Sequence, residues 1–161
     1  MAAARSESRA PADEPIIEIT RLLDAPRALV WMVWTDPKHA GEWWGPDGFS
    51  VTTHAMNVVP GGVWDYVMHG PDGRDYDNLI TFHEVVKPER LVYSHGEPGD
   101  PNQFHVTVTF TEEAGKTRVR MHSVFPSVAA RDFVAREFGA VEGGRQHLDN
   151  LAAYLARQQH A

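Results

Sequence analysis

The chain of 161 residues contains no cysteine, no long apolar run, and fewer basic than acidic side chains. Without cysteine it has no disulfide framework, no thiolate nucleophile and no cysteine-based zinc site, which fits a cytoplasmic location. The formal net charge of -7 argues against nucleic acid and against a polybasic membrane contact, because both need a basic surface. No stretch approaches the ~20 apolar residues that span a bilayer. We therefore expect a cytoplasmic protein with no nucleic-acid partner and no membrane partner.

Motifs for phosphate-containing cofactors and for metals are also missing. There is no GxxxxGK[ST] stretch, and the two GPDG stretches at 45–48 and 70–73 are typical of turns. The nine histidines show neither HxH nor HExxH spacing and are spread over different strand-like segments. Because a zinc site needs three or four converging ligands, we expect no metal and no cofactor.

The length suits one domain. The first residues, MAAARSESRAPADEP, are rich in alanine and charge and lack the apolar segment of a secretory signal. This composition is typical of disorder. We expect a disordered N-terminal tail over residues 1–15 and a single domain over residues 16–161.

Hydrophobic periodicity predicts the order of elements in that domain. A strand is expected over 16–23, and helical spacing follows over 27–35 and 38–44, with Asp24 and Asp36 at the helix starts. A long C-terminal helix starts at Ser127, is interrupted over 138–144 and is completed over 145–159. Between these helices, alternating segments separated by turns predict six strands: 49–59, 63–69, 76–86, 91–96, 104–113 and 117–125.

Consecutive strands with short turns form an antiparallel meander with one apolar face, which needs a cover. The C-terminal helix carries a suitable apolar stripe that includes His147, Leu148 and Leu151. The prediction is an α+β fold: a curved antiparallel sheet of about six to seven strands, two short helices, and a long C-terminal helix packed over the sheet. One straight helix across a curved sheet leaves a hollow between them.

This order resembles the helix-grip fold of the START-like, Bet v 1-like (SRPBCC) superfamily. Five motifs, from Ile16 to Leu155, are similar to those of single-domain, activator-of-heat-shock-ATPase-homologue-like (AHSA-type) proteins. They are EITRLLDAPRALVWMVWTDPKHAGEWWGPDGF, PGGVWDYVMHGPDG, KPERLVYSHG, HVTVTFTEEAGKTRVRM and GAVEGGRQHLDNLAAYL. The resemblance implies a cavity between the sheet and the last helix. Proteins of this fold include lipid carriers, polyketide cyclases and an ATPase-activating co-chaperone domain.

Strand parity and helical spacing place large apolar side chains toward that space. Each aromatic ring there removes ~150–250 Å² from water, either in a filled core or in a pocket wall. Of the pair Trp43 and Trp44, we expect one ring to pack inward and the other to lie at the mouth, with Trp44 placed at the rim. The apolar and aromatic ligand-binding candidates are Trp44, Trp64, Tyr66, Met68, Ile80, Tyr93, Val108, Phe110, Met121 and Leu151.

Four polar residues are predicted to face the same space: Asn78, His95, Glu142 and His147. A buried polar group without a partner costs about 1–3 kcal/mol, so each needs a protein partner or a ligand. An apolar pocket with a few polar anchors is the usual form of a small-molecule site.

Three functions are compatible with this pattern. The first is binding of a small apolar or aromatic molecule in the cavity. The second is a cyclase-like or hydrolase-like enzyme acting on a polyketide-like compound, with His95 or His147 as the catalytic proton-transfer group. The third is a co-chaperone-like ATPase activator, although the chain has only a short polar segment where the co-chaperone carries a further domain. A homodimer is an alternative to the monomer for a protein of this size.

Overall fold

The computed structural model describes residues 6–160, and residues 1–5 and 161 lie outside this description. The four helices are α1 (Arg27–Thr35), α2 (Pro37–Trp43), α3 (Val128–Glu137) and α4 (Ala140–Gln159). The eight strands are β1 (Glu7–Arg9), β2 (Ile16–Leu23), β3 (Ser50–Met56), β4 (Val63–His69), β5 (Asp75–Val86), β6 (Arg90–His95), β7 (Phe104–Glu113) and β8 (Lys116–Val124).

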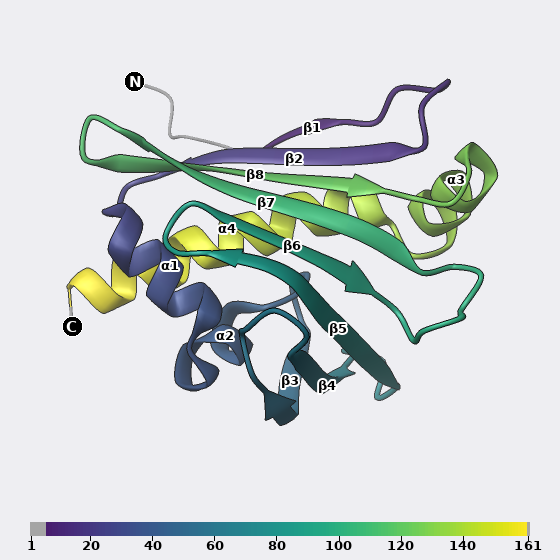
Figure 1. Ribbon diagram of the computed structural model, residues 1–161, viewed down its shortest axis with the longest axis horizontal. Helices are drawn as coiled ribbons and strands as arrows, with labels where there is room; N and C mark the ends of the chain where they lie inside the picture. The colour runs from purple at the N-terminus through teal and green to yellow at the C-terminus, as the bar shows by residue number, and fades with distance from the viewer. Residues whose placement is uncertain (1–5, 161) are drawn as a thin grey trace.

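All eight strands form one antiparallel sheet in the order β1-β2-β8-β7-β6-β5-β4-β3. The sheet is strongly curved, with β3 and β4 turned steeply away from β7 and β8 (Figure 1). Helix α4 runs along one face, α3 lies at one end, and α1 and α2 lie toward the other (Figure 1). The predicted α+β architecture is confirmed, with eight strands where about six to seven were expected. No helix among residues 6–160 has the length and apolar character needed to cross a membrane.

The additional strand corrects the prediction of a disordered tail over residues 1–15. Residues 7–9 pair with residues 18–20 of β2, and the Ser6 hydroxyl donates to Asp149 of α4 at 2.6 Å. Composition indicated disorder because the segment has little apolar surface to bury. An edge strand, however, is held by backbone hydrogen bonds, which any composition can supply. Residues 1–5 of the expected tail lie outside the described residues.

Side chains cap the starts of α2 and α3, whereas α1 and α4 begin without a side-chain cap. Asp36 caps α2 by accepting from the backbone N–H of Lys38 at 2.9 Å, and Ser127 caps α3 by accepting from that of Ala130 at 3.0 Å. The expectation that Asp24 caps α1 is wrong, because Pro26 occupies the cap position without a side-chain bond. The predicted interruption of the last helix occurs at Gly139, whose φ of 59° separates α3 from α4, but it is shorter than the expected 138–144 because residues 140–144 belong to α4.

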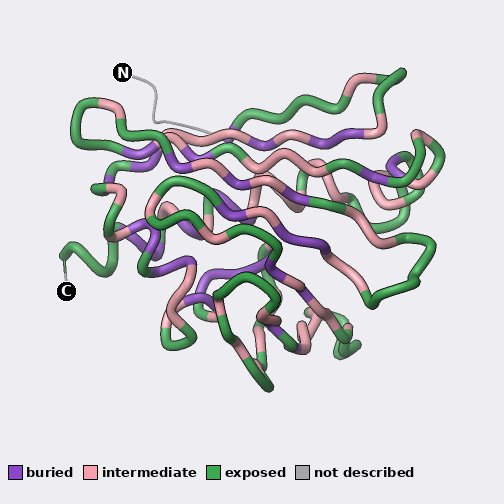
Figure 2. Tube along the Cα trace, viewed as in Figure 1, coloured by how far each residue is buried: buried purple, intermediate pink, exposed green. Residues whose placement is uncertain are grey.

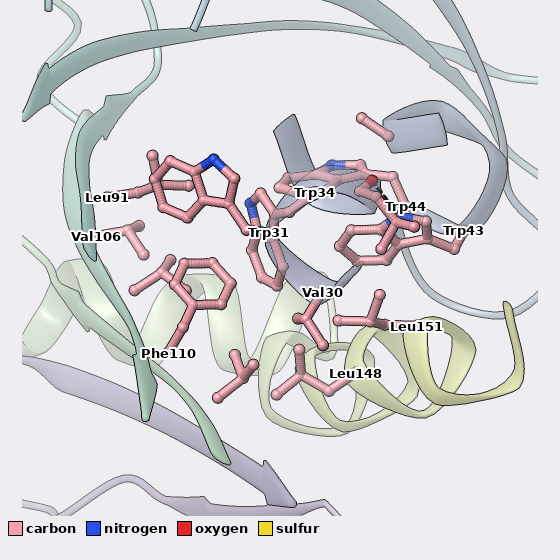
Figure 3. Close-up of a cluster of buried hydrophobic side chains, with 14 of the residues drawn as sticks. Val30, Trp31, Trp34, Trp43, Trp44, Leu91, Val106, Phe110, Leu148 and Leu151 are labelled. Carbon is pink, nitrogen blue, oxygen red and sulfur yellow. Dashed lines mark hydrogen bonds between the residues drawn. The ribbon is translucent and has the colours of Figure 1, made fainter. Parts of the chain in front are cut away.

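A cluster of buried aromatic and aliphatic side chains fills the region where α1 lies between the sheet and α4. The rings of Trp31 and Trp34 meet Phe110 of β7 edge-on, with centroids 5.4 and 5.5 Å apart (Figure 3). Leu148 and Leu151 of α4 close the opposite side of this cluster and are fully buried (Figure 3). Figure 2 shows that burial runs along the central strands, whereas the connecting loops are exposed. This end of the space between sheet and helix is therefore filled by side chains.

Arg131 of α3 is 3 % exposed and fastens the segment before β2. Its guanidinium donates to the carbonyls of Pro11 and Ile16, both at 2.9 Å. We expect Arg131→Met to lower the free energy of unfolding by about 2 kcal/mol, because these charge-assisted bonds are lost. Urea denaturation measures the change. The matched control on the same helix, the exposed Arg136→Met, should change stability by less than about 0.5 kcal/mol. Equal effects of the two substitutions would contradict the anchoring role.

Candidate functional site

Two adjoining hollows lie between α4 and the curved part of the sheet. The inner hollow has a volume of about 220 Å³ and the outer basin a volume of about 790 Å³. They share wall residues from the loop after α2, from β4, β6 and β7, and from the α3–α4 junction. These shared residues are Pro46, Met68, His95, Phe104, Phe138 and Gly143.

Eight of the fourteen predicted ligand-binding residues line these hollows. Their ligand-binding role stays a prediction, but the structure brings them together from β4, β5, β6, β8, α4 and the end of α2. Trp44, Met68, Tyr93, His95, Met121 and His147 line the inner hollow, and Met68, Asn78, His95 and Glu142 line the outer basin.

The other six lie in the packed core, and their expected position on the pocket wall is corrected. Strand alternation and helical spacing correctly placed these six residues on the inward faces of the sheet and the last helix. These patterns do not say which part of the inner face is covered by other side chains. The space in front of these six residues is filled by the indoles of α1 and by those of Trp43 and Trp44. These core residues are Trp64, Tyr66, Ile80, Val108, Phe110 and Leu151.

The tryptophan pair is not divided between interior and mouth, so that expectation is also wrong. Trp43 and Trp44 are 3 % and 6 % exposed. The Trp43 indole N–H donates to the carbonyl of Val33, and that of Trp44 donates to the Tyr66 hydroxyl, both at 3.0 Å. Trp44 forms part of the inner wall rather than a rim, because the loop that follows it folds back over α4.

That loop is fastened to α4 through its own backbone. The Gly45 N–H donates to Nδ1 of His147 at 3.0 Å, and the Gly45 carbonyl accepts from Asn150 at 3.0 Å. One turn earlier on the helix, Gln146 accepts from the Asp47 N–H at 3.1 Å. Gly45 has a φ of 97°, a conformation that favours glycine. We call this set of three bonds the Gly45 clamp.

His147 is a buried polar group of the site. It is 7 % exposed, and its ring meets the indoles of Trp44 and Trp43 edge-on at centroid distances of 4.4 and 5.0 Å. Burial, and secondarily the nearby His95, lowers its pKa to about 3, so the ring is neutral. Because Nδ1 accepts from Gly45, the single ring proton is on Nε2. Within residues 6–160 this buried Nε2 has no hydrogen-bond partner.

His95 is held in a defined tautomer by Asn78. The amide N–H of Asn78 donates to the carbonyl of Tyr76 at 3.0 Å, so its oxygen accepts from Nε2 of His95 at 2.8 Å. The Nδ1 lone pair of His95 is left without a hydrogen bond in the described part of the chain. Burial lowers the pKa of His95 to about 4, and it raises the pKa values of Tyr66 and Tyr93. The polar groups around the inner hollow are therefore uncharged at neutral pH.

Glu142 differs from the other polar candidates. It was expected to face inward, but it is exposed at the edge of the outer basin, with its carboxylate 3.9 Å from Arg145. A group of three histidine, aspartate or glutamate side chains that could hold a metal ion does not occur among residues 6–160.

Several wall residues were missed by sequence reasoning. The missed residues of β2 and β8 could have been found from the sequence, because the alternation along these strands places them on the inner face of the sheet. No sequence signal predicts the hydrogen bond between Gly45 and His147, because it joins positions 102 residues apart. The missed residues of the inner wall include Ile17, Ile19, Val106, Ser123, Phe125 and Phe138.

Comparison with known proteins places the chain in a family. The family model described as Activator of Hsp90 ATPase homolog 1-like protein matches residues 24–156, so the chain belongs to this family. No curated protein sequence matches it. Similar solved structures include a protein from Arthrobacter aurescens (27% identity, 94% of this chain and 91% of that chain, TM-score 0.86). A Mycobacterium smegmatis protein is also similar (26% identity, 94% and 96%, TM-score 0.84).

A more distant similarity concerns the fold alone. CalU16 from Micromonospora echinospora is 21% identical over 99% of this chain and 90% of its own, with a TM-score of 0.62. Together with the matches above, it establishes the Bet v 1-like arrangement that the sequence resemblance implied.

The two neutral imidazoles predict a pH dependence of stability. Their pKa values are about 4 and about 3 in the folded protein and 6.5 in the unfolded chain, so the unfolded state binds more protons in acid. Their contribution to stability is complete above pH 6.5 and is lost as the pH falls toward these folded-state values. Each group changes the free energy of unfolding by at most about 1.4 kcal/mol per pH unit.

Urea denaturation across this window measures the slope. Carboxylates also titrate there, so the informative quantity is the difference between the wild type and the double variant His95→Gln with His147→Gln. We expect the shallower slope in the variant, and the same slope in both proteins would contradict the assignment.

Proposed function

We propose that this protein binds a small apolar or aromatic molecule in the inner hollow, with the outer basin as its entrance. The observation that carries the proposal is the composition of the wall: mostly apolar side chains with a few fixed hydrogen-bonding groups. Ligand sites generally have this form. The inner hollow is larger than the ~150 Å³ apolar cavity that binds benzene in an engineered protein, so one aromatic ring system fits within it.

The rigidity of the wall supports the same proposal. The Trp44 indole is fixed by the Tyr66 hydroxyl, the His95 ring by Asn78, and the His147 ring by the Gly45 clamp. A wall whose side chains are already held in place loses little conformational entropy on binding. We therefore expect the hollow to be preformed rather than created by its ligand.

A proton-transfer enzyme is supported less well. A general base works best when its pKa is near the working pH. The pKa values of His95 and His147 lie well below neutrality, and one nitrogen of each ring is already hydrogen-bonded within the protein. These features favour orientation of a bound molecule over transfer of its protons.

An ATPase activator needs a surface that binds the ATPase. Apart from Phe133 and Phe138, whose ring centroids are 6.0 Å apart, the large apolar side chains that are exposed among residues 6–160 come from different elements: Met32 of α1, Val59 of the β3–β4 turn, Val86 of β5 and Val124 of β8. Interaction sites usually gather such residues into one patch. The hollow therefore supports ligand binding more directly than the outer surface supports a protein partner.

Filling the inner hollow tests the proposal. Ser123 lies on its wall, and we expect Ser123→Phe to weaken binding of naphthalene at least about tenfold, because the new ring occupies the space. Two-dimensional NMR titration with naphthalene measures the affinity and locates the shifts. The matched control, Thr111→Phe, changes an exposed position of β7 and should bind naphthalene as the wild type does. Diffuse, non-saturable shifts in the wild type, or equal affinity in Ser123→Phe, would overturn the proposal.

A further inference from the structure

The unpartnered nitrogen of His147 is the starting point. Its Nε2 carries the ring proton, is buried, and makes no hydrogen bond to any residue in the range 6–160. An unsatisfied buried donor is unfavourable, and an incoming acceptor removes this cost. The rest of the ring is occupied, because Nδ1 is bonded to Gly45 and the indoles of Trp43 and Trp44 pack against it. The inner hollow is the open space that His147 lines.

The charges around the two hollows restrict what that acceptor is. Neither wall includes a lysine or arginine among the described residues, whereas Asp47, Asp77, Glu137 and Glu142 border the outer basin. Glu137 and Glu142 have only exposed arginine neighbours, at 3.5 and 3.9 Å, and such surface pairs contribute little. A carboxylate or phosphate on the ligand would pass acidic side chains and then lie buried without a countercharge, which is unfavourable.

We propose that the ligand is an uncharged apolar molecule with a carbonyl-type oxygen, and that this oxygen accepts the hydrogen bond from Nε2 of His147. This inference rests on the proposed function, since it specifies the chemical class that the same hollow takes. The apolar body packs on Trp44, Met121 and the strand residues around them, and the oxygen enters first. The acidic border of the basin selects against anions of the same size.

Three probes that share one naphthyl group test separately the preference for a carbonyl oxygen and the exclusion of anions. They are 2-acetylnaphthalene, which carries a carbonyl, 2-isopropenylnaphthalene, which has the same shape without oxygen, and 2-naphthoate, which is charged. We expect the wild type to bind the ketone about tenfold more tightly than the hydrocarbon, the gain from one buried hydrogen bond. The carboxylate should bind more weakly than both.

Two substitutions of His147 test whether the preference for the ketone over the hydrocarbon depends on Nε2. In His147→Asn the side-chain amide reaches the position of Nδ1, so the acceptor for Gly45 is kept and the Nε2 donor is lost. In His147→Gln the amide reaches the position of Nε2, so the donor is kept. We expect the ketone and the hydrocarbon to bind equally to His147→Asn, and the ketone preference to persist in His147→Gln. Affinities come from calorimetry, with folding checked by thermal unfolding.

A second readout needs no variant. The infrared carbonyl stretch of 13C-labelled 2-acetylnaphthalene should shift to lower wavenumber in the wild-type complex than in hexane, because the oxygen is hydrogen-bonded. A hexane-like stretch would overturn the inference even if the variants fail to fold. Equal binding of ketone and hydrocarbon by the wild type would also overturn it, and would mean that the indole faces already satisfy the Nε2–H. Absence of binding by all three probes would instead contradict the proposed function itself.

Discussion

The attachment of one loop to one helix determines the shape of the inner hollow. Gly45 gives both of its backbone polar groups to α4, and Gln146 adds a third bond to the same loop. These bonds fix the loop over the helix, and the loop in turn carries Trp44 into the interior. Because buried backbone groups must be paired, the clamp satisfies a strict requirement of folding while it places an aromatic wall. The clamp thus holds the loop that carries Trp44, whose indole is also held by the Tyr66 hydroxyl, and it orients the His147 ring.

The division between filled core and hollow follows from where the helices meet the curved sheet. Toward one end, α1 inserts Trp31 and Trp34 between β7 and α4 and leaves no space (Figure 3). Farther along α4, Gly144 lets the helix approach β2 so closely that a Cβ would lie 2.8 Å from Ile19. The sheet curves away from this contact toward β5 and β4, and α1 does not extend there (Figure 1). The inner hollow lies beside the Gly144 contact, and the outer basin extends toward the α3–α4 junction.

Much of this architecture is readable from local pattern, because the period of a strand or helix depends on its own residues. The segments 16–23, 63–69 and 104–113 are strands with the expected bounds, and most of their inward residues are buried, with Met68 and Phe104 half-buried. The apolar stripe of the last helix correctly placed His147 inside. The segment 7–9 escaped prediction because an edge strand needs no apolar signature.

The site was harder to predict than the fold, because parity distinguishes the two faces of a sheet and does not locate a gap on one of them. Phe110 and Met121 have the same inward orientation, yet Phe110 is packed against α1 and Met121 lines the inner hollow. The difference depends on how far α1 reaches, which is a property of the assembled layers. The buried position of Trp44 likewise depends on the distant His147, and no local spacing encodes that contact.

The two nitrogens of His147 belong to one conjugated ring, so a hydrogen bond at one nitrogen affects the hydrogen bond at the other. An acceptor that draws on the proton at Nε2 increases the electron density at Nδ1, which strengthens the bond that Nδ1 receives from Gly45. By thermodynamic reciprocity, a tighter loop also raises the affinity for that acceptor. If a molecule binds at Nε2 as proposed, the same imidazole therefore strengthens the attachment of the Gly45 loop to α4 without any helix having to move.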